Sequence, residues 1–356
     1  MSPFIFLMVI VVLYITSKPR IRRFVERDDV YLSREWTSFV NALFIALVVC
    51  SHGLNLFETN IREYFPEKCT AFGIGLFGQL MVTTFFFYSG YGIMLSLLNR
   101  GGYERMLICP RFISLSMNFV LAVFVYFVAH CVMQGEIKWS DFLGGLHDYQ
   151  FLGNPTWFIL MTLLSYVLTY VCFILTRGKT HPSVFCICLT ILLTVVIFLV
   201  SRIKPFHWVN TLLCLPAGMF YYLKGESIEK LLKSTKIPSL IYSLLLIALG
   251  WHVYHAGIRP AIYTQNIAGI IFAIGTTWLV GSFEWKSPSR ILIWLGGSGL
   301  FTVYMFHLLP MRVLTHLGCN SGNPYFVWLA VTIATAVLVL FANFGYRKLN
   351  VLLLSK

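Results

Sequence analysis

TSFVNALFIALVVCSHGLNLF, the stretch at residues 37–57, decides the fold. It is apolar along its whole length except for a few small polar residues and one histidine, His52. A helix needs roughly 20 such residues to cross a bilayer. Similar runs recur along the rest of the chain, so we predict an all-α protein, a polytopic transmembrane helix bundle.

The composition agrees with a membrane protein. Hydrophobic residues make up 58% of the 356 residues and charged residues only 12%, against about 25% in soluble domains. These values exclude a soluble enzyme, a disordered chain and a nucleic-acid-binding protein, although the net charge is +13. Lys and Arg instead collect on cytoplasmic loops, where they favour anionic head groups, so membrane lipids are expected partners.

The apolar runs predict about ten core helices. A shorter run at residues 3–16 predicts either an extra N-terminal helix or an interfacial anchor, and we see no secretory signal in it. We therefore divide the chain into an N-terminal apolar helix and basic cytoplasmic segment (1–33), a transmembrane domain (34–345) and a short cytoplasmic tail (346–356). The ten predicted spans are 37–57, 72–98, 112–133, 156–176, 183–201, 207–223, 237–254, 263–281, 291–310 and 324–345.

The basic residues predict the orientation. Of the 27 Lys and Arg residues, 20 fall in the N-terminal segment after residue 16, the C-terminal tail and alternate loops between them. Because positive charge concentrates on the cytoplasmic side, these segments and the C-terminus are expected in the cytoplasm.

The ionisable groups inside the predicted spans are histidines. The 14 acidic residues all fall in predicted loops or at helix ends, which argues against an ion-coupled transporter. His52 lies in the first long span and His307 in the ninth. A histidine in a bilayer needs a polar partner, so each is either an interhelical hydrogen bond or a proton-transferring group. The sequence leaves both interpretations open.

Three other stretches combine residue types that suit a binding site. FFFYSGYG at residues 85–92 places Gly90 and Gly92 where a helix or a ligand can approach closely. Residues 100–111 carry arginines that suit phosphate groups, although ordinary positive-inside bias also explains them. GNPTWF at 153–158 contains Trp157, which is either an interface anchor or a ligand contact.

The order of these motifs resembles the acyltransferase-3 family of integral membrane O-acyltransferases. The resemblance covers roughly residues 34–345 and rests on a histidine late in the first long span, Phe-Phe-x-x-Ser-Gly-Tyr in the second, an inner arginine before the third, x-x-Trp-Phe opening the fourth, and Tyr-x-x-His near the end. One position departs from the family's pattern: many members carry an arginine eleven residues before the histidine, where this chain has Asn41.

The resemblance implies a membrane O-acetyltransferase of the bacterial cytoplasmic (inner) membrane. Acetyl would move from cytosolic acetyl-CoA to a hydroxyl of an envelope glycan or lipid-linked sugar, with no metal. His52 matches the family's essential histidine, and Ser89 and Arg111 match the serine and the inner arginine. Our full hypothesis gives catalytic roles to His52, Ser89 and Tyr88, donor binding to Arg100, Arg105 and Arg111, and acceptor binding to Asn55, Asn154, Trp157 and His307.

A non-enzymatic transporter or flippase of a lipid-linked sugar is the alternative function. It would need the same polytopic bundle with aromatic and basic cavity residues. Release of free CoA from acetyl-CoA separates the two classes, because a carrier would not release it.

Overall fold

The protein is helical, as predicted, and we describe it from a computed structural model. The structure describes residues 3–22, 31–56, 75, 77–147, 156–235, 237–256, 262–286, 288–319 and 324–354. Its elements are α1 (Pro3–Thr16), β1 (Pro19–Ile21), α2 (Arg34–Leu56), α4 (Leu80–Asn99), α5 (Tyr103–Met106), the π-helix η1 (Leu107–Phe112), α6 (Ile113–Gln134), α7 (Trp139–His147), α8 (Thr156–Leu175), α9 (Pro182–Val200), the 3₁₀ turn η2 (Phe206–Trp208), α10 (Cys214–Ser234), α11 (Ser239–His255), α12 (Ile262–Gly281), β2 (Phe283–Trp285), α13 (Arg290–Gly296), α14 (Leu300–Phe306), α15 (Leu308–His316) and α16 (Pro324–Leu354).

Every predicted span overlaps a helix, but fewer helices than expected meet the criteria for a membrane span. In the described part of the chain, 6 helices are long and apolar enough to cross a membrane, or up to 8 if each of two bent pairs is one span. In one pair, α10 continues to Ser234, beyond the predicted end at 223, and meets α11 at 116°. In the other, the predicted span 291–310 breaks between α13 and α14 at 63°, in the glycine-rich sequence Gly296-Gly297-Ser298-Gly299.

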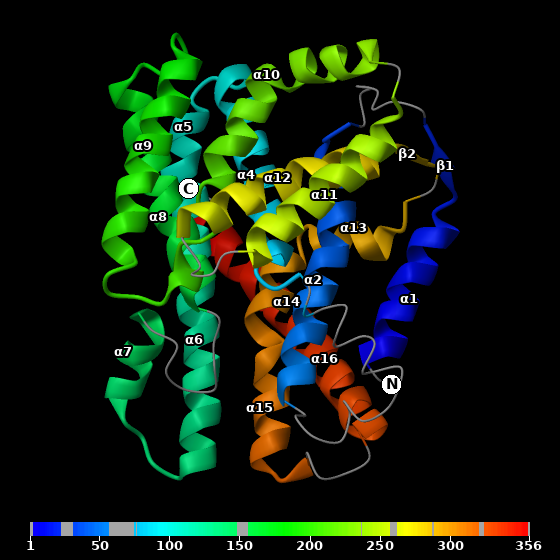
Figure 1. Cartoon of the computed structure of the whole chain (residues 1–356). Coiled ribbons are helices and arrows are strands. Elements are labelled where there is room, and N and C mark those ends of the chain that lie inside the picture. The colour runs from blue at the N-terminus through cyan, green and yellow to red at the C-terminus, as the bar shows by residue number, and fades with distance from the viewer. Residues whose placement is uncertain are drawn as a thin grey trace.

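Helix α2 lies at the centre of the arrangement. It contacts α1, α4, α13, α14 and α15 (Figure 1). The predicted N-terminal helix α1 packs on α2 through Ile10, Phe39 and Ala42. The Tyr14 hydroxyl also donates a hydrogen bond to the Phe39 carbonyl. The chain after α1 pairs β1 antiparallel with β2, so the N-terminal segment is joined to the loop that follows α12.

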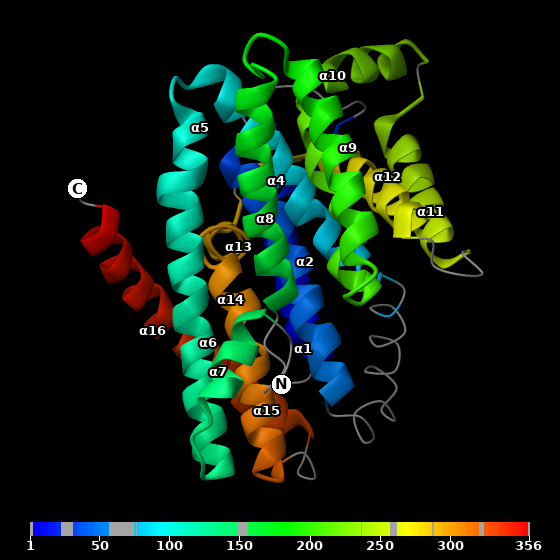
Figure 2. The ribbon, with the colours of Figure 1, turned by 90° about the vertical axis from the view of Figure 1, so that its left-hand side faces the viewer.

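Different elements form the two ends of the bundle. Helix α5 with Arg105, the α8–α9 loop and the α10–α11 corner lie at one end, which we call the basic end (upper end in Figures 1 and 2). The β1–β2 sheet lies in the same half of the molecule (Figure 1). The lower ends of α2, α6 and α15 lie at the opposite end (Figure 2). The loops that the positive-inside rule assigns to one side of the membrane therefore do share one end of the structure.

Two glycines let α4 and α10 approach closely. A Cβ at Gly90 would come within 1.9 Å of the Leu215 carbonyl oxygen, and one at Gly218 within 1.9 Å of the Phe87 carbonyl oxygen. Gly92, two residues further on, has open space at this position. Gly90 therefore lies at a helix–helix contact. This is the packing interpretation of the glycines in FFFYSGYG.

Candidate active site

His52 and His307 meet inside the bundle, although 255 residues separate them. Nδ1 of His52 lies 2.7 Å from Nε2 of His307, and the two ring planes are within 15° of parallel. His52 comes from the last turns of α2, and His307 occupies the single position between α14 and α15. The structure therefore joins the two histidines that the sequence had placed in separate spans.

The hydrogen bonds define which nitrogen carries each proton. Nδ1 of His307 lies 2.9 Å from the Tyr304 carbonyl oxygen and 3.1 Å from the Val303 carbonyl oxygen. Carbonyl oxygens only accept, so Nδ1 of His307 carries a proton, and in the neutral ring Nε2 is an acceptor. His52 must then donate from Nδ1, which leaves the Nε2 lone pair of a neutral His52 free to take a proton. No described residue forms a hydrogen bond with that Nε2.

Neighbouring helices hold the two rings in place. A Cβ at Gly53 would lie 1.8 Å from the ring of Trp328, so only glycine lets α16 pack over α2 beside His52. Tyr126 of α6 donates a hydrogen bond of 2.6 Å to the Met305 carbonyl oxygen, next to the residues that bind the His307 ring. Because Gly53 lies inside α2, its backbone N–H belongs to the helix and is not a free donor for substrate.

A cavity of about 220 Å³ lies between α2, α4, α8 and α14. Ser89 lines it, as do Asn41 and Tyr166, and the Oδ1 atom of Asn41 is buried there with no hydrogen-bond partner among the described residues. Tyr304 forms part of the wall, and its ring centroid is 6.1 Å from that of His307. The cavity therefore ends one side chain away from the histidine pair.

The arginines of the predicted donor site lie at the basic end, near the other side of this cavity. Arg100, Arg105 and Arg111 are exposed, and the Arg111 guanidinium stacks over the buried Tyr103 ring at 5.0 Å. Arg111 is also close enough to Tyr166, in the cavity wall, to act on it electrostatically. Arg111, the cavity and the histidine pair thus follow one another from the basic end towards the opposite end.

Tyr88 lies apart from this line of residues. Its hydroxyl accepts a hydrogen bond of 3.2 Å from Thr277 of α12, and its ring packs edge-on against Trp36 at 5.9 Å. Trp36 precedes His52 by four and a half helical turns, about 24 Å along α2. Consecutive residues of a helix point in directions about 100° apart, so Ser89 reaches the cavity and Tyr88 does not.

The predicted acceptor residues are only partly described. Trp157 is 8% exposed and packs against Phe158 and His207, so little of its ring surface is open in this conformation. Asn154 and the Asn55 side chain lie outside the described residues.

The sequence analysis did not anticipate the positions of two charged side chains. Arg312 was expected in an outer loop, but it lies on α15, is half-buried and is close enough to His52 to interact with it electrostatically. Glu229 fell in the predicted loop between the spans 207–223 and 237–254, yet it is only 5% exposed. It accepts hydrogen bonds from Tyr221 at 2.5 Å and Tyr31 at 3.0 Å. A search for apolar runs ends each predicted span at the first charged residues. It therefore could not indicate the positions of Glu229 and Arg312 in the folded chain.

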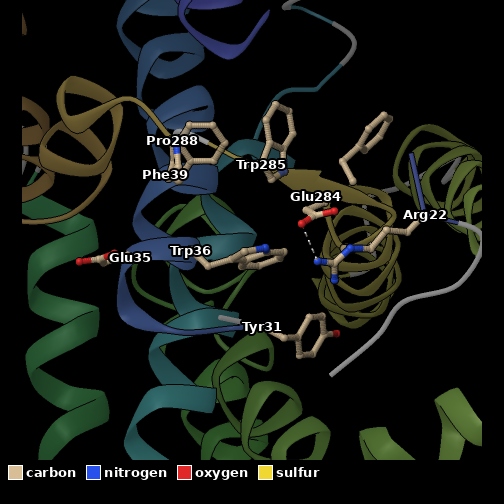
Figure 3. Close-up of a pocket in the computed structure, with 10 residues that line it drawn as sticks. Arg22, Tyr31, Glu35, Trp36, Phe39, Glu284, Trp285 and Pro288 are labelled. Carbon is tan, nitrogen blue, oxygen red and sulfur yellow. Dashed lines mark ion pairs between the residues drawn. The ribbon is translucent and has the colours of Figure 1, made fainter. Parts of the chain in front are cut away.

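A second cavity, of about 170 Å³, lies at the basic end near this cluster (Figure 3). Tyr31, Trp36 and Trp285 surround it, and Arg22 faces Glu284 at 3.9 Å, whereas Glu35 points away. Since it is centred near Trp36, it is far from the histidine pair and is not where the pair could act. No group of three His, Cys, Asp or Glu residues suited to a metal occurs in the described ranges.

These features describe a polytopic membrane protein with a hydrogen-bonded pair of histidines close to a cavity. Comparison with protein families then gives the class. A family model described as an acyltransferase domain matches residues 35–344 of the chain. The chain belongs to the acyltransferase-3 family and is a membrane acyltransferase. Searches of curated proteins and of solved structures gave no match.

Proposed function

We propose that this acyltransferase moves an acetyl group from acetyl-CoA to a hydroxyl of an envelope glycan or lipid-linked sugar, with His52 as the general base. The observation that carries the proposal is the hydrogen bond between His52 and His307, which leaves Nε2 of His52 unprotonated. A base that removes the hydroxyl proton is what transfer from a thioester to an alcohol requires.

The donor would bind from the basic end. Arg100, Arg105 and Arg111 would hold the phosphates of CoA, because guanidinium groups bind phosphate by charge-assisted hydrogen bonds. The long arm of CoA that carries the acetyl group would enter the cavity lined by Ser89 and Asn41. Tyr304 closes the cavity towards His307, so a movement of its side chain would bring the thioester to the histidine pair.

The donor, the acceptor hydroxyl and the two histidines account for every bond and proton of the reaction. The acceptor hydroxyl loses its proton to Nε2 of His52 while its oxygen forms a bond to the thioester carbonyl carbon. The carbonyl electron pair moves onto the oxygen and gives a tetrahedral intermediate. On collapse the C–S bond breaks, and the CoA sulfur leaves and takes the proton back from His52. His307 accepts the Nδ1–H bond throughout and so stabilises the charged ring.

The test is His52→Ala in purified protein reconstituted into vesicles with acetyl-CoA and an envelope polysaccharide fraction of the source cells. We expect acetyl incorporation and free CoA release to fall by about 100- to 10,000-fold, the usual contribution of a general base. His181→Ala is the control, because this exposed histidine lies at the basic end. Activity retained in His52→Ala, or absent from the unaltered protein, would contradict the proposal.

A further inference from the structure

An uncharged wall surrounds the cavity between α2, α4, α8 and α14. Most of this wall consists of aromatic rings, from Phe85, Phe86, Phe158, Tyr166, Phe301 and Tyr304. Asn41, Ser89 and Thr162 add neutral polar groups, and the rest is aliphatic or glycine. Every side chain that the structure places in the wall is therefore uncharged at neutral pH.

Arg111 and Arg312 lie outside this wall. The Arg111 guanidinium is exposed at the basic end, where it lies over the Tyr103 ring. Arg312 belongs to α15, which contributes none of the described lining residues. An acyl group that carried a carboxylate would therefore have no cationic partner among the described residues that line the cavity.

Packed rings form the end of the cavity that faces the histidine pair. The centroid of the Phe158 ring lies 5.0 Å from that of Phe86 and 4.9 Å from that of Tyr304. All three side chains are at most 8% exposed. On the proposed path of the donor, the acyl group passes these rings on its way to His52. Burial of an ionised carboxylate in such surroundings is strongly unfavourable, whereas burial of a methyl or ethyl group is favourable.

Asn41 supplies a hydrogen-bonding group to this neutral cavity. The residue is half-buried, and its Oδ1 atom is buried without a partner among the described residues. A buried acceptor without a hydrogen bond is unfavourable, so a ligand that brings an N–H group would stabilise it. The arm of CoA contains secondary amides, each with one N–H and one carbonyl. The Asn41 amide therefore suits the uncharged arm of CoA.

We propose that this cavity restricts the donor to CoA thioesters of uncharged acyl groups, and that Asn41 binds an amide of the CoA arm. This inference rests on the proposed function, because it takes the cavity as the path of the donor. Selection follows from the cost of burying a carboxylate without a cation, a cost that an acetyl or propionyl group does not carry.

The first test compares propionyl-CoA with malonyl-CoA in the vesicle assay with the unaltered protein. The two acyl groups have the same number of carbon atoms, and malonyl adds a carboxylate. From free CoA release, we expect kcat/KM for malonyl-CoA to be lower by at least about tenfold and up to about 1,000-fold. A smaller difference would overturn the proposal. So would an equal loss with propionyl-CoA relative to acetyl-CoA, because size and not charge would then select the donor.

The second test places a cation in the cavity. Asn41→Arg should raise the ratio of kcat/KM for malonyl-CoA to that for propionyl-CoA by at least about tenfold. Asn99→Arg is the matched control, because Asn99 is exposed at the end of α4 and outside the wall, so the ratio should stay unchanged. Thermal unfolding in detergent reports on folding. An unchanged ratio in folded Asn41→Arg contradicts the proposal, and if this variant does not fold, the first test decides.

Asn41→Leu tests the hydrogen bond to the arm. Loss of one neutral hydrogen bond should raise KM for acetyl-CoA by about three- to tenfold, with kcat changed less. An unchanged KM would remove Asn41 from donor binding. Acetyl-CoA is measured beside the other donors throughout. A protein inactive with acetyl-CoA contradicts the proposed function, whereas one that is active with acetyl-CoA but does not discriminate against malonyl-CoA contradicts this inference alone.

Discussion

Two buried polar clusters lie at different levels of the bundle, and they are built differently. Near the basic end, Tyr31 and Tyr221 both donate to Glu229, and the Trp278 indole N–H donates to Tyr221 at 2.8 Å. Towards the opposite end, His52 and His307 share one hydrogen bond, and Nε2 of His52 has no partner among the described residues. The polar groups of the first cluster form hydrogen bonds with one another. The second cluster leaves one acceptor nitrogen, Nε2 of His52, without a partner among the described residues.

This difference predicts that the Glu229 cluster contributes to stability and that the histidine pair contributes to the reaction. A buried network in which every member is satisfied fixes the helices that contribute to it. An open lone pair contributes nothing to stability, yet it is what a reaction needs. We therefore expect variants of the Glu229 cluster to change the unfolding temperature and variants of the histidine pair to change turnover.

Among variants of His307, Gly90 and Glu229, His307→Leu is expected to have the largest effect. It removes the acceptor for Nδ1–H of His52 and leaves a buried donor unsatisfied, which costs about 1–3 kcal/mol. Turnover should fall by about 10- to 100-fold, since 1.4 kcal/mol corresponds to tenfold. His307→Gln keeps an acceptor and should recover part of the rate. CoA release measures both, and equal rates for the two variants would show that His307 does not act through this bond.

Gly90→Ala tests helix packing away from the pair. Its Cβ would overlap the Leu215 carbonyl oxygen, so α4 and α10 must separate. We expect a loss of about 1–3 kcal/mol of stability, the usual cost of overpacking, measured as a lower unfolding temperature. Gly92→Ala is the matched control, because open space surrounds that position. A Gly90→Ala protein as stable as Gly92→Ala would contradict the observed helix contact.

Glu229→Gln should have the smallest effect and should act on stability alone. The amide still accepts a hydrogen bond, but the bonds from Tyr31 and Tyr221 lose their charge assistance, worth about 1 kcal/mol. Glu226→Gln is the control, since Glu226 is exposed and forms an ion pair with Lys230 at 2.8 Å. If Glu229→Gln abolished turnover at unchanged stability, the distinction between the two clusters would be wrong.

Much of the fold could be predicted because apolar runs determine transmembrane helices. The sequence does not show where such a run bends. The span predicted at 291–310 breaks at Gly296-Gly297-Ser298-Gly299. Helix α10 continues past Lys224 to Ser234 through a charged stretch at which a hydrophobicity-based prediction ends the span. Hydrophobicity also could not show that Glu229 is buried, since burial of a charge depends on partners from other elements, here Tyr31.

The candidate site could be predicted only in part. Motif order predicted His52 and Ser89 as site residues, but nothing in the sequence joins His52 to His307, which is 255 residues away along the chain. The same motif suggested Tyr88, which the helix turns towards Thr277 instead. Which nitrogen of each ring is protonated follows only from the carbonyl oxygens of Val303 and Tyr304 in the folded chain.

The protonation of the two rings is the central claim, and nitrogen NMR of the ¹⁵N-histidine-labelled protein in lipid tests it most directly. His52→Ala and His307→Gln samples assign the signals. At neutral pH we expect both rings to be neutral, each with a protonated Nδ1 and an unprotonated Nε2. A His52 ring with its proton on Nε2 would leave no base facing the substrate and would contradict the account.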